Sequence, residues 1–274
     1  MPAARPTAAA PAPVAAVGEL ALAVVKGTRL AHPRAVAIDA DGLRDDRRFH
    51  VVSAHAMQHG AARAALTRVA ADWDPASGRL TLRFPDGAVA DGVVAPGEPV
   101  VGHPAWDRRR AVRGRAVRGP WSAALSRWLG QEVRLVEASG PRRAHDVAPV
   151  TLVGRASAAA LGAALGVGDL GVRRFRMNLA LDGLASYAED RWLGRTIAVG
   201  GCRLRVTGAV PRCVVVTRDP ETARRDHDVL RALAATRPPL PGPDGAPARA
   251  PLGVYAEVVQ PGVVAVGDRV ALLD

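Results

Sequence analysis

The sequence predicts a β-rich α+β protein, and three features of its pattern support that class. Short β-branched runs alternate with Gly, Pro and Asp along most of the chain, as expected for many strands joined by tight turns. Apolar residues at helical spacing occur in only a few short segments. With 274 residues, 49% of them hydrophobic, the chain can bury a full core. No apolar run reaches the ~18–20 residues that a membrane span needs.

The first part of the chain is expected to hold a tail and a set of strands. Residues 1–16 are almost all Ala and Pro, which prevents a stable helix and predicts a disordered tail. Asp39-Ala40-Asp41-Gly42 and Pro85-Asp86-Gly87 supply turn residues between some of the strands that follow. The strands expected here lie at 19–25, 35–38, 48–53, 80–84 and 111–117.

The second part of the chain begins with apolar residues at helical spacing. Trp121, Leu125 and Leu129 recur at helical spacing, and Gly130 is suited to end that helix. The other elements expected here are helices beginning near 157 and over 228–235, and strands at 133–137, 150–153, 177–181, 196–199, 203–210, 214–218, 255–259 and 270–273.

These elements predict two β-rich domains after the tail. We place the first, barrel-like domain at 17–120 and the second at 121–274. Residues 237–251 carry six Pro and two Gly, so we expect a mobile loop there.

The formal charge of +11 comes from 36 Arg and a single Lys, Lys26. A basic balance often indicates nucleic-acid binding, but abundant Arg, Ala, Gly and Pro are also typical of biased codon usage. In such a chain the lone Lys26 and the lone Asn178 are informative, because Arg and Lys differ in shape, hydration and hydrogen-bond geometry. Both residues are therefore candidates for a site where substitution fails.

Two cysteines, Cys202 and Cys213, exclude a disulfide scaffold and a cysteine-rich metal site, and they predict a reducing cytoplasm. Cys213 follows Arg212 at the start of an apolar segment. A nearby cation favours the thiolate, which is both the nucleophile and the metal ligand. Two alternatives stay open: a buried structural cysteine, or a disulfide to Cys202 if Thr207-Gly208 turns a hairpin.

Polar residues recur at alternate positions of the strand expected near 177. Arg174 and Arg176 are expected to point to one side, with Asn178 on the same face. Such donors suit a phosphate or a heterocycle, and the alternative is an ordinary solvated face. His145 beside Asp146 suggests an acid–base pair, although neighbours on a strand point apart.

A run of six Arg lies between Arg108 and Arg118. No stacking aromatic residues are interleaved with it, so a solvated face or a docking surface for an acidic partner is favoured over nucleic acid. The seven His show no paired metal-ligand spacing, and we do not expect a zinc site.

Taken in order, several motifs resemble MOSC proteins over about residues 18–274. The branch that the chain resembles carries an N-terminal MOSC β-barrel domain and includes the mitochondrial amidoxime-reducing component and its bacterial relatives. The resemblance implies a β-barrel-like domain packed on a MOSC β-barrel with a few short helices. It rests on Lys26-Gly27, Gly42-Leu43, Asp46-Arg47-Arg48-Phe49, Asp146, Pro149-Val150 with Ser157, Arg174-Phe175-Arg176-Met177-Asn178, Tyr187-Ala188-Glu189-Asp190 with Trp192, Arg212-Cys213 with Asp219-Pro220, Gly253-Val254-Tyr255 and Val266-Gly267-Asp268.

In that family a molybdenum cofactor is bound, with the metal held by a molybdopterin dithiolene and one cysteine. Soft thiolate ligands suit this role, and Cys213 matches the ligand cysteine. The cofactor positions of the family are matched by Lys26, Gly27, Arg47, Asp146, Arg176, Asn178 and Arg212. Whether Arg47 or Arg48 faces the cofactor stays open. Gly27 stands where Ser is frequent, so a hydroxyl contact is missing, and Met177 replaces a usual Pro.

The function that the resemblance implies is reduction of N-hydroxylated compounds by a molybdenum-dependent oxidoreductase. Electrons are expected from a separate ferredoxin- or flavin-type protein, with a small molecule as substrate and no nucleic acid or membrane as partner. Two alternatives are kept. One is a sulfur-carrier or cofactor-handling protein with a persulfide on Cys213, and the other is a non-catalytic anion- or pterin-binding protein.

Overall fold

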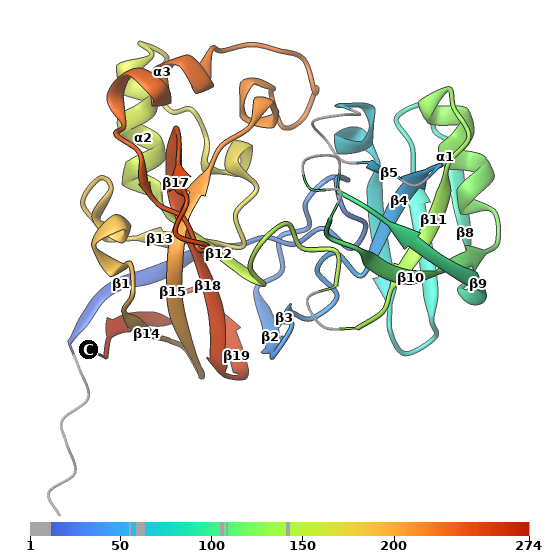
Figure 1. Ribbon diagram of the computed structural model, residues 1–274, viewed down its shortest axis with the longest axis horizontal. Coiled ribbons are helices and arrows are strands. Elements are labelled where there is room, and N and C mark those ends of the chain that lie inside the picture. The colour runs from blue at the N-terminus through green and yellow to red at the C-terminus, as the bar shows by residue number, and fades with distance from the viewer. Residues whose placement is uncertain are drawn as a thin grey trace, which may run out of the picture.

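Two lobes lie side by side in the computed structural model (Figure 1). It describes residues 12–54, 56–58, 64–104, 107, 109–140 and 143–273. One lobe is a closed β-barrel covered by two helices, and the other is built of two open sheets and one helix. The predicted β-rich α+β class is confirmed.

The barrel contains seven strands in the order β1-β13-β12-β18-β15-β14-β20. β1 pairs with both β13 and β20 and so closes the barrel. The two longest strands, β15 and β18, run antiparallel along each other, and alternate residues of β15 face the core. The strand bounds are β1 Pro13–Leu20, β12 Val150–Gly154, β13 Leu179–Asp182, β14 Thr196–Val199, β15 Cys202–Pro211, β18 Pro251–Gln260 and β20 Arg269–Leu272.

The other lobe holds a five-stranded sheet, β5-β4-β11-β10-β9, and a three-stranded sheet, β6-β7-β8. Helix α1 packs between them, and its Trp121 is fully buried and donates from Nε1 to the Leu80 carbonyl at 3.1 Å. The strand bounds are β4 Phe49–Ser53, β5 Ala56–Gln58, β6 Ala70–Asp74, β7 Arg79–Arg83, β8 Val89–Val93, β9 Ala95–Gly102, β10 Val112–Arg118 and β11 Arg134–Ala138.

The remaining strands form two small sheets. In one, β19 from the C-terminal part of the chain pairs with β2, which pairs with β3. In the other, β16 and β17 form a short hairpin within the predicted loop 237–251. The bounds are β2 Ala35–Asp39, β3 Gly42–Leu43, β16 Leu240–Pro241, β17 Pro247–Ala248 and β19 Gly262–Ala265.

The helices are short. Helix α1 ends as predicted, because Gly130 adopts the left-handed conformation that glycine tolerates. The α-helices are α1 Trp121–Leu129, α2 Arg155–Ala164 and α3 Val229–Thr236, and the 3-10 helices are η1 Ala64–Arg68, η2 Val172–Phe175, η3 Ala188–Trp192 and η4 Val214–Thr217.

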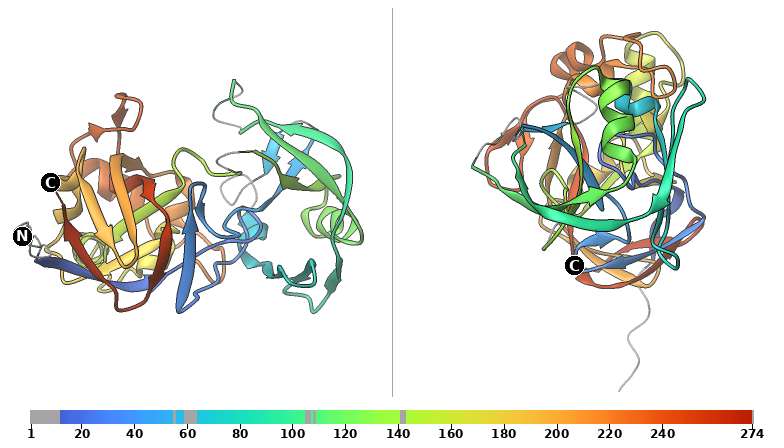
Figure 2. Two further views of the ribbon diagram at one scale, coloured as in Figure 1. Left: turned by 90° about the horizontal axis from the view of Figure 1, so that it is seen from below. Right: turned by 90° about the vertical axis from the view of Figure 1, so that its right-hand side faces the viewer.

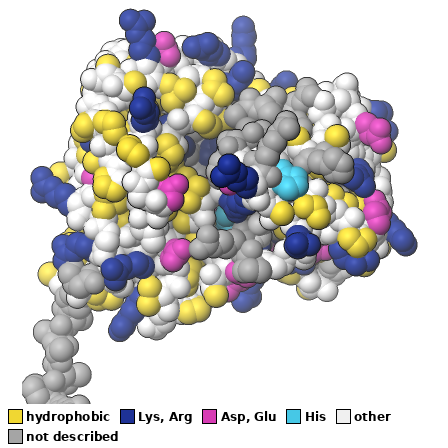
Figure 3. All heavy atoms as spheres, in the orientation of Figure 1, with side chains coloured by type: hydrophobic (Ala, Val, Ile, Leu, Met, Phe, Trp, Pro, Cys, Tyr) yellow, Lys and Arg dark blue, Asp and Glu magenta, His cyan; other side chains and the backbone are white. Residues whose placement is uncertain are grey.

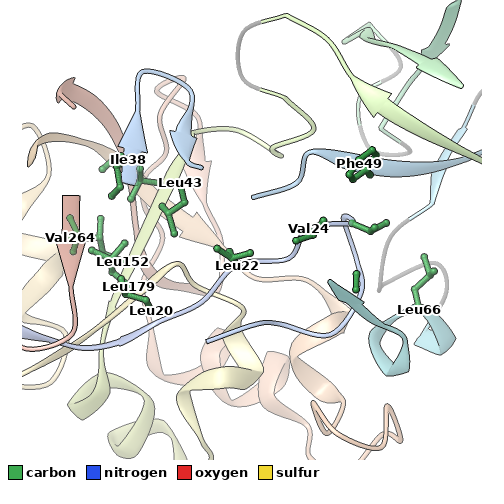
Figure 4. Close-up of a cluster of buried hydrophobic side chains, with 14 of the residues drawn as sticks. Leu20, Leu22, Val24, Ile38, Leu43, Phe49, Leu66, Leu152, Leu179 and Val264 are labelled. Carbon is green, nitrogen blue, oxygen red and sulfur yellow. The ribbon is translucent and has the colours of Figure 1, made fainter. Parts of the chain in front are cut away.

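One hydrophobic core joins the two lobes (Figure 4). The buried segment after β1, which includes Leu22 and Val24, runs from the barrel interior to Phe49 and Leu66 in the other lobe. Burial of such side chains contributes about 1.5–3 kcal/mol each. A core of this kind fixes the segment that carries Lys26 between the lobes.

The sheet pairing places elements from both sides of the predicted boundary at residue 121 in the same lobe. Helix α1 and β11 belong to the lobe formed by the N-terminal strands, whereas β1 belongs to the barrel. Because β1 begins at Pro13, the last four residues of the predicted tail are part of the barrel. Residues 1–11 lie outside the described residues.

Candidate cofactor site

Asp46 lies at the centre of the junction between the lobes, with no exposed surface. Its Oδ1 accepts the Ala23 amide at 2.8 Å, and its Oδ2 accepts from Asn178 Nδ2 at 2.9 Å and from the Arg47 guanidinium. Burial favours the neutral acid, but these neighbours, Arg47 first, hold the pKa of Asp46 below its ordinary value. Asp46 is therefore a buried anion that orients Arg47.

Asn178 supports Asp46 from the barrel side. Its Oδ1 accepts the Thr151 amide and hydroxyl at 3.1 and 2.9 Å, while Nδ2 donates to the Ala21 carbonyl as well as to Asp46. An amide supplies both the acceptor and the donors that this position uses, whereas Asp would set a second carboxylate against Asp46. Asn178 thus reaches the site through Asp46 and Arg47.

Lys26 is buried between the lobes and is held by two oxygens. Its Nζ donates to the Ala144 carbonyl at 2.7 Å and to Asp146 Oδ1 at 2.5 Å. Burial lowers the pKa of Lys26, and Asp146 opposes that shift. Gly27 follows at φ 92°, a conformation that a side chain would strain.

Arg47 and Arg48, between which the sequence did not decide, point to different places. Arg47 adopts a left-handed conformation with φ 51° and pairs with buried Asp46. Arg48 instead pairs with Glu137 at 2.6 Å and lies 4.7 Å from the Trp73 ring. Arg47 is the one that faces the junction.

The prediction that Arg174 and Arg176 share one face of a strand is wrong. Residues 172–175 form the 3-10 helix η2, and Arg176 is left-handed at φ 54°. Arg174 turns to a bidentate pair with Asp226, at 2.8 and 2.6 Å. Arg176 donates to the Thr28 carbonyl at 2.6 Å, and it has no carboxylate partner among the described residues.

Arg212 and Cys213 follow the end of β15. Arg212 donates to the Phe175 carbonyl and lies 3.2 Å from Met177 Sδ, while its Nε is buried without a hydrogen-bond partner. Cys213 is exposed at the start of η4. The strand predicted at 214–218 is wrong, because the chain turns there and the Thr217 hydroxyl bonds back to the Val214 carbonyl at 2.7 Å.

The predicted hairpin that would bring Cys202 opposite Cys213 is also wrong. Strand β15 continues through Thr207-Gly208, and at ~3.3 Å per residue its length keeps the two residues far apart. Both cysteines are free, and Cys202 is buried in the barrel core. Burial raises the pKa of the Cys202 thiol, so Cys202 is suited to packing rather than to chemistry.

Lys26, Arg47, Arg176 and Arg212 form what we call the cation cluster. Arg47 interacts electrostatically with Lys26 and Arg176, and Arg176 with Arg212. Burial, together with Arg47, lowers the pKa of Arg176 to about 10. On the face shown in Figure 3, Lys and Arg side chains gather at a hollow between the lobes.

The cation cluster carries more positive charge than its own carboxylates neutralise. Asp46 and Asp146 pair with Arg47 and Lys26, while Arg176 and Arg212 form no salt bridge in the described part of the chain and interact with these carboxylates only at longer range. Buried charges are ordinarily paired, so this surplus and the unpartnered Arg212 Nε fit an anionic ligand. The exposed thiol of Cys213 next to Arg212 adds a soft metal ligand.

His145 and Asp146 do not form the acid–base pair that their adjacency suggested. His145 Nδ1 lies 3.9 Å from Asp46, and its Nε2 lies 3.1 Å from the Asp41 carbonyl, whereas Asp146 faces Lys26. Burial lowers the pKa of His145 to about 4, so the ring is neutral near pH 7.

Two residues of this region were not predicted as site residues. Asp46 was named only as part of a motif, although an acidic residue directly before two Arg could have marked it as a site residue. Tyr255, 7% exposed, interacts electrostatically with Asp146, Arg212 and Cys213, and burial raises its pKa to about 12. Tyr255 is one of only two tyrosines in the chain, and this rarity could have pointed to it.

The MOSC domain model matches residues 139–271. This segment begins just after β11 and includes all the barrel strands except β1. The chain thus matches the MOSC domain over this segment, which is just under half of its length.

Similar proteins include the mitochondrial amidoxime-reducing component 1 of Homo sapiens, 32% identical over 130 residues, which are 47% of this chain and 38% of that protein. The Mus musculus protein of that name is 34% identical over 101 residues, 36% of this chain and 29% of the relative. The matches thus span about a third of these relatives' length. The molybdenum cofactor sulfurase of Danio rerio is 38% identical over 66 residues, 24% of this chain and 8% of the sulfurase.

Among solved structures, the YuaD protein of Bacillus subtilis aligns with a TM-score of 0.45 and 13% identity, covering 94% of each chain. Within the described residues, no helix has the length and apolar character required to cross a membrane. The same residues contain no group of three or more His, Cys, Asp or Glu placed to hold a metal ion.

Proposed function

We propose that this protein binds the molybdenum cofactor at the cation cluster and Cys213 and reduces N-hydroxylated compounds. The observation that carries the proposal is the surplus of positive charge at Arg176 and Arg212 beside the exposed thiol of Cys213. An anionic pterin with a phosphate supplies the missing negative charge, and its metal accepts a thiolate. The similarity to amidoxime-reducing components supports the same reaction class.

Each residue of the site has a distinct part in this proposal. Cys213 provides the protein ligand to the metal, and Arg176, Arg212 and Lys26 provide charge-assisted hydrogen bonds to the anionic groups of the cofactor. Asp46 and Asn178 act as positioning residues, because they hold Arg47 without facing the ligand themselves.

The reaction is a two-electron reduction in which an N–O bond breaks. A compound R–NH–OH takes up two electrons and two protons and becomes R–NH2 and water. The bound cofactor supplies the two-electron redox chemistry. The protein supplies a low-dielectric junction in which fixed cations orient the reactants.

Electrons would come from a separate ferredoxin- or flavin-type protein, in a reducing cytoplasm. Strand β10 offers an acidic partner a row of exposed cations, because Arg113, Arg115 and Arg118 alternate with buried residues. Arg108, at the start of the predicted basic run, lies outside the described residues. Charge reversal at Arg113 and Arg115 should slow electron delivery by an acidic donor and weaken its salt dependence.

The test is to express the chain in a host that makes the molybdenum cofactor, and to measure molybdenum, pterin and benzamidoxime reduction with reduced methyl viologen as donor. We expect molybdenum and pterin in equal amounts, and benzamidine as product. Protein without metal or pterin, or a loaded protein without turnover, would contradict the proposal.

The Lys26→Ala variant sharpens this test. Losing a charge-assisted hydrogen bond costs about 1.5–3 kcal/mol, which corresponds to a roughly ten- to hundredfold loss of cofactor affinity. Arg29→Ala is the matched control, because Arg29 is an exposed cation three residues away that pairs with Glu221. Equal cofactor retention in the two variants would remove Lys26 from the site.

A second candidate function is favoured by the exposure of Cys213 and by the similarity to cofactor sulfurases. In that case Cys213 carries a persulfide instead of binding metal permanently. Mass spectrometry of the purified protein distinguishes the two. One additional sulfur atom on the Cys213 peptide, with no bound molybdenum, would support the sulfur carrier.

A further inference from the structure

Met177 adds a sulfur contact to the cation cluster and is one of only three methionines in the chain. The side chain is 5% exposed and packs among apolar residues of the barrel lobe. Its Sδ lies 3.2 Å from a terminal nitrogen, Nη1, of Arg212 and accepts a hydrogen bond from it. A thioether is a weak, uncharged acceptor, so this contact can fix the direction of the guanidinium and leave its charge intact.

Within the described residues, every group that contacts the Arg212 guanidinium directly is uncharged. Nη2 donates to the Phe175 carbonyl, and the guanidinium carbon lies 5.6 Å from the centre of the Phe175 ring. Nε is buried and has no hydrogen-bond partner. Asp146 acts on Arg212 only through longer-range electrostatics. Weak contacts thus hold the side chain in one orientation, while it keeps its positive charge and one unused donor.

The space for the Met177 side chain depends on Gly253 of β18. Gly253 adopts φ 76°, and a Cβ atom there would lie 2.6 Å from Met177 Cε and 2.5 Å from the Leu152 carbonyl oxygen. Both distances are too short for packed atoms, and a side chain is also strained at this φ. Strand β18 runs beside β15, which leads to Arg212 (Figure 2, left). The glycine therefore lets the methionine pack where it meets Arg212.

Arg174 shows the effect of a charged acceptor on an arginine of the same lobe. Its two terminal nitrogens donate to the carboxylate of Asp226, at 2.8 and 2.6 Å, and the charges of this pair cancel. Arg212 meets a sulfur atom and a carbonyl oxygen where Arg174 meets a carboxylate. A methionine therefore suits a position at which the arginine has to be oriented and also stay available to an anion.

We infer that Met177 is a positioning residue for Arg212: its thioether keeps the guanidinium directed at the bound anion and leaves the charge to that anion. The identity of the natural anion, the cofactor, rests on the proposed function. The orientation itself requires no cofactor, so a free anion should report it. Because a preorganised donor loses less conformational entropy on binding, a neutral acceptor at residue 177 should raise anion affinity, and a charged acceptor there should lower it.

Three substitutions of Met177 separate the acceptor role from packing, with inorganic phosphate titrated into the cofactor-free, full-length protein. Met177→Leu keeps an apolar side chain without an acceptor, so phosphate should bind about threefold more weakly. Met177→Gln supplies an amide oxygen, so its affinity should stay within about twofold of the wild type. Met177→Glu would pair with Arg212 and should lower the affinity by about tenfold or more. Isothermal titration calorimetry measures the four proteins.

Met57 is the matched control, because it is a buried methionine of the other lobe. Met57→Leu should leave the phosphate affinity unchanged. In NMR spectra of wild-type protein with isotope-labelled methionine methyl groups, phosphate should shift the Met177 signal and leave the Met57 signal in place. Arg212→Gln should abolish this response to phosphate, which a methionine that only packs would not show in the first place.

The inference is overturned if Met177→Leu binds phosphate as tightly as the wild type, if Met177→Gln binds it as weakly as Met177→Leu, or if the Met177 methyl signal ignores phosphate. Circular dichroism checks that each variant folds, and where Met177→Gln or Met177→Glu does not, Met177→Leu and the NMR response decide.

Molybdenum and pterin are measured separately, on protein from a host that makes the cofactor. A loaded protein in which Met177→Leu changes neither phosphate nor pterin affinity would refute the inference alone. The expected order of the Met177 variants in a protein that never takes up molybdenum or pterin would refute the proposed function alone.

Discussion

The cation cluster lies beside an open pocket lined by Asp107, Asp146 and Asp244, and the two regions meet at Tyr255 and Asp146 but carry opposite charge. In the cluster, Arg176 and Arg212 form no salt bridge with a described residue, while in the pocket, Asp107 and Asp244 form none. The surplus in the cluster does not stabilise the fold, because half-buried charges of one sign repel one another and lose hydration, whereas Asp244 is exposed and Asp107 is partly exposed. The difference teaches that unpaired charge points to a ligand in the cluster, where it is half-buried, and is ordinary in the pocket, where it is solvated.

Two arginines show the same distinction at closer range. Arg174 and Arg176 are two residues apart, yet Arg174 has a bidentate carboxylate partner and Arg176 has a carbonyl oxygen. The pair between Arg174 and Asp226 is internal to the barrel lobe. Arg174, which is buried with its own anion, supports the fold, whereas half-buried Arg176 forms no salt bridge with a described residue and is available to a ligand.

Removing each arginine gives the largest expected difference between these roles. Arg174→Ala leaves Asp226 without its partner and should lower the free energy of unfolding by about 3 kcal/mol. Arg176→Ala removes an uncompensated cation, so the metal-free protein should keep its stability while pterin affinity falls roughly ten- to hundredfold. Denaturant unfolding and pterin fluorescence measure the two quantities. Equal stability losses would contradict the distinction.

Asp46 tests whether the cation cluster depends on its buried anion. Asp46→Asn should destabilise the protein by about 2 kcal/mol at pH 7, because it removes the charge-assisted bond to Arg47. The native pKa of Asp46 is depressed, so its contribution is present above the unfolded pKa of about 3.9 and disappears as the pH falls through the native pKa. Urea unfolding from pH 7 to 3 should show the two proteins converging. Parallel curves would exclude this role.

His145 has the smallest effect near pH 7, because its imidazole is largely neutral there in both the folded and the unfolded chain. Its pKa is about 4 in the folded protein against about 6.5 unfolded, so the unfolded chain takes up a proton first as the pH falls. Stability should decrease by about 1.4 kcal/mol per pH unit between 6.5 and 4 on account of this group. His145→Gln should flatten that slope, and an unchanged slope would show that His145 is protonated in the fold.

Much of the fold could be predicted because local signals and tertiary packing agree. The periodicity of α1 and the glycine that ends it are both local signals, and so are the turn residues after β2 and β7. The strand predicted at 214–218 is absent because the chain turns there. The turn buries Val216 in a hydrophobic cluster of the barrel lobe, next to α3. A periodicity of two residues could not show that turn.

The candidate site shows the same limit of prediction from local sequence patterns. The rarity of Lys26 and Asn178 drew attention to two residues that both lie at the junction, but rarity could not show that Asn178 uses its amide hydrogens for bonds to Ala21 and Asp46. Nor could it distinguish Arg174 from Arg176, since their partners, Asp226 and the Thr28 carbonyl, are distant in the sequence. Such partners are fixed only once the lobes close around their shared core.

The most direct test measures molybdenum and pterin together in the wild-type chain and in two cysteine variants. We predict one molybdenum and one pterin per loaded chain, and the same values in Cys202→Ala, because Cys202 is a buried barrel residue. Cys213→Ala should lose the metal and all reductase activity while it folds normally and keeps part of the pterin through the cation cluster. Full metal content and turnover in Cys213→Ala would contradict the central claim that Cys213 and the cation cluster form one cofactor site.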